Sequence, residues 1–292
     1  MAITIQKDLL RIYDLGFLEK LLIDRTTGTN ILWATDSYAG LGPEYRRDEP
    51  IELALITGEN AGLIRTRTEK AKDEQSVRAK RHAEICTPSC LCNEMINFID
   101  EEGILGRPDA FNKDCVPTDR VVLPEKPERH KTEPWKEYVD YQVLEITCGE
   151  APFLVSRYDA VDGREIEIRD RIGLLDRKLR IVSENAGSEE EWLKWATRAF
   201  KATYGYELQG DSLLIARLNL LVTFEEYLKA RWGREPTRQE YMAIIRIITW
   251  NIWQMDGLTH KIPYCKVGAP PECQIYDWRG RHALEYSSIG RD

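Results

Sequence analysis

The chain has 292 residues, a net charge of −8 at pH 7 and a pI near 5.3. This acidic balance argues against a dedicated nucleic-acid binder, because Lys and Arg contacts to phosphates dominate affinity for DNA. The 42% hydrophobic content can fill a packed core, while no apolar run reaches membrane-spanning length and the N-terminus lacks the pattern of a signal peptide. We therefore expect a cytoplasmic protein that makes no contact with membranes.

The first predicted element is a helix over residues 8–22, where apolar side chains recur near the 3.6-residue helical spacing. Residues 30–35 have the composition of a strand. A second helix is predicted over residues 87–100, because Thr87 can cap it and Pro88 suits a first turn.

The distribution of Gly and Pro along the chain predicts three regions. Residues 1–102 are predicted to form a mixed N-terminal lobe. Residues 103–135 are rich in Gly, Pro and charge, which predicts a loop or linker. Residues 136–292 are predicted to form the main domain.

The main domain begins with a short buried strand over residues 142–146 and a turn at 147–150. We expect Pro152 to open a helix that runs to Tyr158. Residues 164–168 alternate polar and apolar side chains like a small surface strand.

Helices are predicted next at about 171–184, 188–202 and 211–231. A capping box from Thr237 to Glu240 predicts the start of another helix, and residues 250–255 read as a strand. Strands that alternate with helices predict an α/β fold, in which a parallel sheet is flanked by crossover helices.

Acidic residues stand at or just after the expected strands. They are Glu145, Glu207 and Asp256, and Cys148-Gly149 form the turn after the first strand. Ligands of open parallel sheets bind at the carboxyl ends of the strands, so these residues are candidates for a binding site. An acid at a strand end also commonly caps a helix or faces solvent, and three in order are stronger evidence than one.

Five segments resemble the methylase subunits of type II restriction–modification systems, which are similar to gamma-type DNA adenine-N6 methyltransferases. The resemblance covers about residues 30–278. The segments are HAEICTPSCLCNEM, LEITCGEAPFLVSRYD, RIGLLDRKLR, YGYELQGDSLLIARLNLL and WNIWQMDGL.

The resemblance implies S-adenosylmethionine as cofactor and a Rossmann-like class I methyltransferase fold. Thr87-Pro88 match a family motif whose threonine helps to hold the methionine end of the cofactor. The first cofactor motif is matched by Glu145, Thr147, Cys148 and Gly149, although Glu150-Ala151-Pro152 stand where a second glycine is usual.

Three further residues are carried over in the same way. Phe153 belongs to the apolar pair that closes the first motif, Glu207 matches the ribose-binding acid, and Asp256 matches the acid near the adenine amine. Phe153 also fits a plain core position, and Thr87-Pro88 also fit a simple helix start.

The family's Asn-Pro-Pro-Tyr motif, which receives the flipped adenine, does not occur in this sequence. The only paired prolines are Pro270-Pro271, and an acid follows them. The resemblance therefore implies only the cofactor-binding half of the fold, incomplete at its C-terminus, and it leaves the catalytic residues unassigned. We expect the chain to reach double-stranded DNA through a partner or missing domain, and to methylate no DNA when isolated.

A half-domain of this kind is expected to leave the strand over 142–146 with an open edge. A downstream subunit or a second copy of the chain is the expected partner of that edge. Residues 274–278 are the expected cover from within the chain, because they are apolar and precede a turn-prone Arg-Gly.

Two other functions stay open at this point. One is a catalytically inactive S-adenosylmethionine-binding or interaction protein that retains the fold. The other is a nuclease. Pro108-Asp109 could begin the acidic motif of a nuclease site, although no Glu-x-Lys pattern follows it on an evident strand.

The seven cysteines do not predict a metal site. Their odd number, without a secretory signal, favours reduced thiols. Cys86, Cys90 and Cys92 are separated by three residues and one residue, unlike the repeated two-residue spacing of zinc knuckles.

Overall fold

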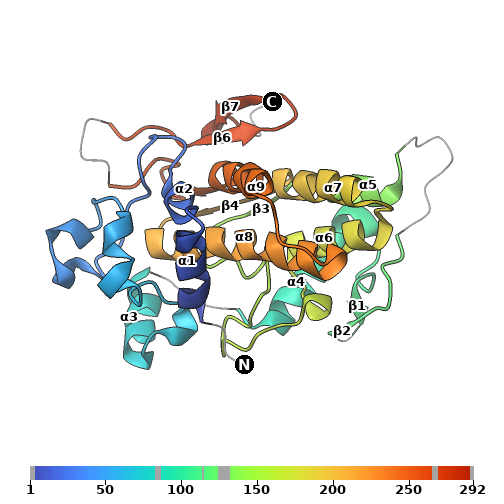
Figure 1. The fold of residues 1–292 in the computed structure, drawn as a ribbon, viewed down its shortest axis with the longest axis horizontal. Helices are drawn as coiled ribbons and strands as arrows, with labels where there is room; N and C mark the ends of the chain where they lie inside the picture. The colour runs from blue at the N-terminus through green and yellow to red at the C-terminus, as the bar shows by residue number, and fades with distance from the viewer. Residues whose placement is uncertain (1–3, 83–86, 114, 124–131, 265–268, 290–292) are drawn as a thin grey trace.

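A three-stranded parallel sheet forms the centre of the molecule (Figure 1). The computed structural model describes residues 4–82, 87–113, 115–123, 132–264 and 269–289. The strands are β3 (Val143–Glu145), β4 (Thr203–Glu207) and β5 (Ile252–Gln254), and they lie in the order β3-β4-β5. A mixed α/β fold with a parallel sheet is therefore confirmed.

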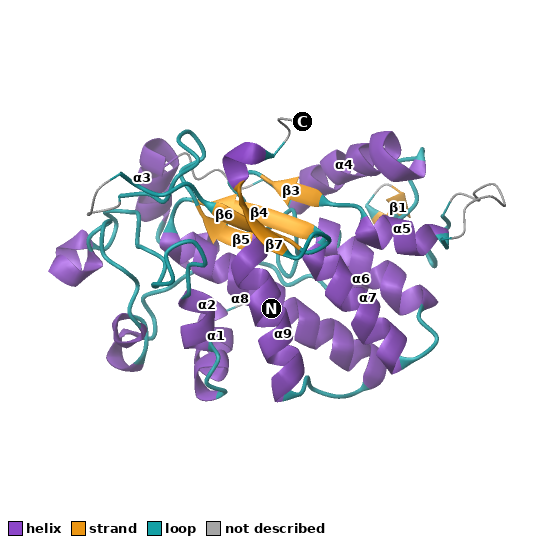
Figure 2. Cartoon of the chain, turned by 90° about the horizontal axis from the view of Figure 1, so that it is seen from above, coloured by secondary structure: helices purple, strands orange, loops and turns teal. Residues whose placement is uncertain are grey.

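Four helices connect the strands and lie together on one side of the sheet (Figure 2). Between β3 and β4 the chain forms α6 (Leu174–Asn185) and α7 (Glu189–Lys201). Between β4 and β5 it forms α8 (Gly210–Trp232) and α9 (Arg238–Asn251). The predicted capping box of α9 is confirmed, because the Thr237 hydroxyl and the Glu240 carboxylate each accept the other residue's backbone N–H.

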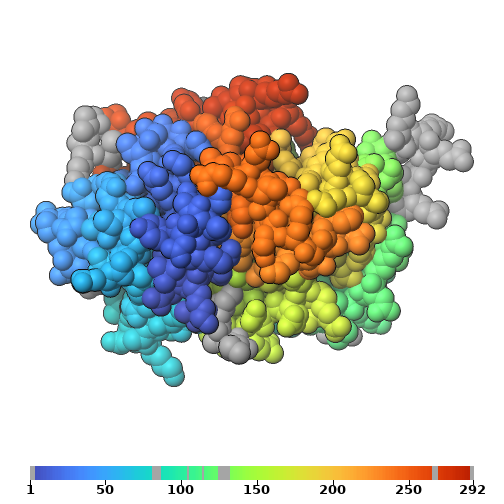
Figure 3. Space-filling model, in the orientation of Figure 1, coloured from blue at the N-terminus to red at the C-terminus, as the bar shows by residue number. Residues whose placement is uncertain are grey.

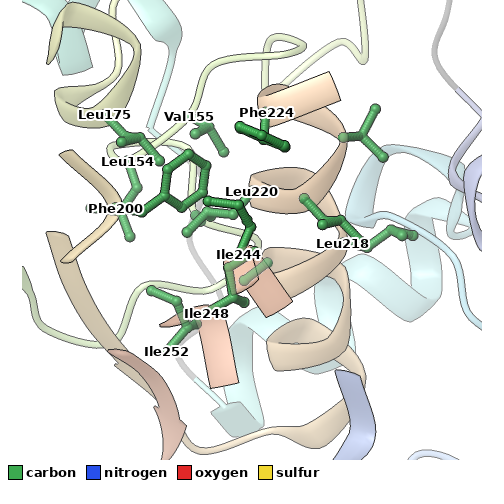
Figure 4. Close-up of a cluster of buried hydrophobic side chains, with 14 of the residues drawn as sticks. Leu154, Val155, Leu175, Phe200, Leu218, Leu220, Phe224, Ile244, Ile248 and Ile252 are labelled. Carbon is green, nitrogen blue, oxygen red and sulfur yellow. The ribbon is translucent and has the colours of Figure 1, made fainter. Parts of the chain in front are cut away.

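The core lies between these helices and the sheet (Figure 4). Phe200 of α7 meets Phe224 of α8 edge-to-face, with ring centroids 6.0 Å apart. Ile248 of α9 and Ile252 of β5 close the same cluster from below. Helix α8 is buried along most of its length, so it is the helix around which the others pack.

The N-terminal segment packs against the same helices rather than standing apart (Figure 3). It begins with α1 (Ile5–Asp14) and α2 (Leu18–Leu22), so the single helix expected over 8–22 is wrong. Gly16 adopts a φ of +74°, a left-handed conformation that ends α1 and that glycine tolerates best. Arg11 joins α1 to α8 through an ion pair with Glu225.

The next part of the N-terminal segment contains no extended strand at 30–35. Those residues form only single-residue bridges, such as the one between Leu32 and Pro50. Helix α3 (Lys72–His82) and helix α4 (Ser89–Asp100) follow. The region expected as a loop contains a short antiparallel pair, β1 (Asn112–Lys113) and β2 (Val116–Pro117). Helix α5 (Pro134–Asp140) then leads into β3.

The helix expected from Pro152 to Tyr158 is absent, since residues 152–154 form a turn and the rest have irregular backbone apart from a single bridge at Tyr158. Long-range hydrogen bonds hold them in that conformation. The N–H of Leu175 donates to the carbonyl of Leu154 at 2.8 Å, and the N–H of Ser156 donates to Asp176 at 2.7 Å. The strand expected over 164–168 is likewise reduced to one bridge, between Tyr158 and Glu165.

A C-terminal hairpin covers the opposite face of the sheet from α8 (Figure 1). It consists of β6 (Gln274–Asp277) and β7 (His282–Glu285). Its side chains pack on Tyr204 and Trp253, and the Tyr204 hydroxyl donates to the carbonyl of Tyr276 at 3.2 Å. The expectation that residues 274–278 cover the edge of β3 is therefore wrong, because they cover a face.

Strand β3 is an edge strand. It pairs with β4 on one side, and no other strand of the described residues pairs with its second side. Leu144 is 42% exposed and Ile146 is 64% exposed beside this edge. Within the described part of the chain, no helix is long and apolar enough to cross a membrane.

Candidate functional site

A cavity of about 710 Å³ lies at the carboxyl ends of the three parallel strands. This is the position at which open parallel sheets bind ligands, and the volume is in the range of small-molecule sites. Eight of the nine residues selected from the sequence line it. They are Thr87, Glu145, Thr147, Cys148, Gly149, Phe153, Glu207 and Asp256.

Pro88 is the one selected residue outside the cavity lining. It occupies the N-cap position of α4, so the helix begins at Ser89 rather than at Thr87. The backbone N–H of Ser89 donates to Asp159 at 2.9 Å, which holds the start of α4 near the cavity. Thr87 precedes this start and contributes to the wall.

The loop after β3 has an unusual backbone. Thr147, Gly149 and Ala151 all have left-handed φ values, of 51°, 55° and 68°. A β-branched residue such as Thr147 rarely adopts this conformation, and such strain concentrates at functional sites. The loop is held against β4 because the Cys148 N–H donates to the carbonyl of Tyr206 at 2.8 Å.

Glu207 joins two of the strand ends. One carboxylate oxygen accepts the N–H of Gly149 at 2.9 Å, and the other accepts the N–H groups of Leu208 and Gln209 at 2.9 and 3.0 Å. Burial raises the pKa of Glu207, while these backbone hydrogen bonds oppose the shift. The carboxylate is therefore rigidly placed in the cavity wall.

Glu145 lies next to Glu207 in the same wall. One of its carboxyl oxygens is buried and has no hydrogen-bond partner among the described residues. Burial and then the charge of Glu207 raise the pKa of Glu145 well above its ordinary value. A buried acceptor without a partner favours a ligand that brings a donor or a positive charge.

Asp256 lies beyond the end of β5 at the start of a tight loop. Its carboxylate accepts a hydrogen bond from the N–H of Leu258 at 2.9 Å, and its backbone N–H donates to the carbonyl oxygen of Lys261 at 3.0 Å. A Cβ at Gly257 would make a tight contact of 3.0 Å with the Tyr206 hydroxyl, so the loop packs closely on Tyr206 there. The loop therefore brings Asp256 and Leu258 to the cavity wall.

Three further lining residues form a polar network that sequence reasoning missed. Glu150 accepts the N–H of Arg67 at 2.6 Å and the hydroxyl of Tyr158 at 2.7 Å. Asn219 of α8 donates to the Tyr158 hydroxyl and to the Glu150 carbonyl, both at 3.0 Å. The acid found in place of the usual second glycine thus ties the loop after β3 to the N-terminal segment. In the sequence, the sign of this network was Glu150 itself, which stands where the matched motif usually has a second glycine.

The cavity is rich in acceptors and aromatic surface. Its lining contains four acids and, among the described residues, one cation, Lys80. Phe153, Tyr206 and Tyr264 supply flat apolar area. This chemistry favours a ligand with hydroxyl groups, a positive charge and a planar ring.

The cysteines do not assemble into a described metal site. No group of three or more potential His, Cys, Asp or Glu ligands occurs in the ranges that the structure describes. Cys86 lies outside those ranges. No family model matches the chain, and neither a curated protein nor a solved structure matches it significantly.

Proposed function

We propose that the chain is the S-adenosylmethionine-binding component of a DNA adenine-N6 methyltransferase in a restriction–modification system. The observation that carries this proposal is the convergence of eight residues, selected from the sequence for this role, on one cavity at the strand ends. They come from the residue before the N-cap of α4, from the ends of β3 and β4, and from the loops after β3 and β5, which are far apart in the sequence. In this proposal the fold is half of a Rossmann-like methyltransferase domain.

The residues present fit the cofactor. Glu207 would hold the ribose hydroxyls, Asp256 the adenine amine, and Thr87 with Glu145 the methionine end. The unpartnered oxygen of Glu145 suits an ammonium group, and the acid-rich wall suits a sulfonium. When bound, S-adenosylmethionine supplies an activated methyl group.

The role of this chain would be to position that methyl group and to limit the access of water. Methyl transfer needs an acceptor amine in line with the methyl donor, and orientation supplies much of the rate. We propose that the acceptor adenine is held by a polypeptide that pairs with the open edge of β3. That polypeptide would also provide most of the contacts to double-stranded DNA.

Calorimetry with S-adenosylmethionine tests the proposal. The wild-type chain should bind with at least micromolar affinity, about −8 kcal/mol. Glu207→Gln removes one acceptor oxygen while it keeps the shape, and it should weaken binding at least about tenfold. Glu190→Gln changes an exposed acid on α7 away from the cavity lining and should bind like the wild type. Folded wild-type protein that gives no binding heat would refute the proposal.

A further inference from the structure

Two cysteines from distant parts of the chain meet at the surface. The Sγ atoms of Cys90, in the first turn of α4, and Cys115, in the turn between β1 and β2, are 2.7 Å apart. Both side chains are exposed, whereas Cys92, Cys148 and Cys273 are buried. Among the described cysteines, only this pair combines proximity with access for a reagent.

The surrounding structure holds the two thiols in place. Asn93 of α4 and Asn112 of β1 exchange two side-chain hydrogen bonds of 2.7 Å each, and both residues are buried. This reciprocal pair fixes α4 against the β1–β2 turn close to the thiols. When one of two adjacent thiols carries a mixed disulfide, the other attacks it at a high effective concentration.

We propose that Cys90 and Cys115 form a dithiol modification site that closes to an intramolecular disulfide by exchange with a small-molecule disulfide. The thiolate of one cysteine attacks a sulfur of the small molecule, which forms a mixed disulfide and releases one small thiolate. The second cysteine then attacks the protein sulfur of the mixed disulfide, and the second small thiolate leaves. The two protein thiols are oxidised, the small molecule is reduced to two thiols, and the two thiol protons pass to those thiolates or to water.

The modification would act close to the cavity. Thr87 lines the cavity and lies three residues before Cys90, just before the start of α4. A bond from Cys90 to Cys115 would anchor this helix start to the β1–β2 turn. The inference does not depend on the identity of the cavity ligand, because it concerns only the chemistry of the two thiols.

The full-length reduced chain, incubated with oxidised glutathione and EDTA, tests the proposal by intact mass and non-reducing peptide mapping. The wild type should lose the mass of two hydrogens and yield one cross-linked pair of peptides, which contain Cys90 and Cys115. Cys90→Ser should instead retain a glutathione adduct on Cys115. In the wild type the mixed disulfide should not accumulate, because the second thiol displaces glutathione within the molecule faster than a second glutathione can react.

Cys273→Ser removes a buried thiol and should form the cross-link as the wild type does. Stable glutathione adducts on both cysteines of the wild type would overturn the proposal. So would a cross-link between another pair of cysteines. Stoichiometric zinc that protects both thiols before EDTA is added would also overturn it.

Discussion

Glu207 accepts the backbone N–H of Gly149 at 2.9 Å, which ties the end of β4 to the loop after β3. The same carboxylate also accepts hydrogen bonds from the N–H groups of Leu208 and Gln209, just before α8 begins. One side chain therefore aligns two strand ends and a helix start around the cavity. It is a structural support as well as a candidate ligand.

Replacement of Glu207 by Ala should destabilise the chain because it leaves three backbone N–H groups without their acceptor. We expect a loss of about 1–3 kcal/mol in the free energy of unfolding, measured with urea. Glu207→Gln retains one acceptor oxygen and should lose less. Equal stability of the Ala variant and the wild type would show that water replaces the carboxylate at no cost.

Several elements follow from local signals. The capping box of Thr237 and Glu240 lies within four residues, so sequence alone locates the start of α9. The strand ends converge because parallel strands place their carboxyl ends at one edge, which is why acids far apart in sequence meet at the cavity. These parts of the site were predictable.

Other parts depend on contacts that no local pattern contains. The segment after Pro152 has a plausible helix start, yet the N–H groups of Leu174 and Leu175 donate to carbonyls of this segment, which forms a turn followed by irregular backbone. The network of Glu150, Tyr158 and Asn219 arises only when α8 packs against the loop. The hairpin β6–β7 covers a face of the sheet because Tyr204 and Trp253 present aromatic surface there.

Gly210, the first residue of α8, should not tolerate a side chain. A Cβ there would lie 2.0 Å from the carbonyl oxygen of Leu32. The N–H of Gly210 also donates to the carbonyl of Trp33 at 2.9 Å, which fixes this close approach. We expect Gly210→Ala to lower the free energy of unfolding by about 2 kcal/mol or more. Gly40→Ala is the matched control, because no atom lies within 4 Å of its added Cβ. Similar urea midpoints for the two variants would contradict this contact.

Lys178 should make stability depend on pH. Its ammonium donates to the carbonyls of Tyr141 and Ala202 in the interior, and burial lowers the pKa of Lys178 from 10.5 to about 7. Between these two values the folded state binds fewer protons than the unfolded state, so stability rises with pH across that window.

Lys178→Met removes this titration. The stability of the wild type relative to Lys178→Met should therefore increase from about pH 7 toward pH 10. Urea denaturation of both proteins at a series of pH values measures the difference. A difference that stays constant with pH would show that the Lys178 pKa is ordinary.

The open edge of β3 should promote association. Leu144 is 42% exposed on this strand, and the N–H and C=O groups of a bare edge are a template for pairing. We expect the isolated wild-type chain to self-associate in sedimentation velocity, and Leu144→Lys to shift it toward monomer. Leu41→Lys changes an exposed leucine of the N-terminal segment and should leave association unchanged. A monomeric wild type at high concentration would contradict the open-edge account.

Hydrogen–deuterium exchange with and without S-adenosylmethionine tests most directly the proposal that this cofactor binds in the cavity at the strand ends. Cofactor binding in the cavity should slow exchange in two separate peptides, one spanning residues 145–154 and the other spanning residues 204–210. The N–H groups that Glu207 accepts, including those of Gly149 and Gln209, lie in these peptides. Protection of both peptides at saturating cofactor is the predicted result. Unchanged exchange would contradict the assignment of the site. So would protection confined to residues 116–119 and 227–231, which line a separate cavity away from the strand ends.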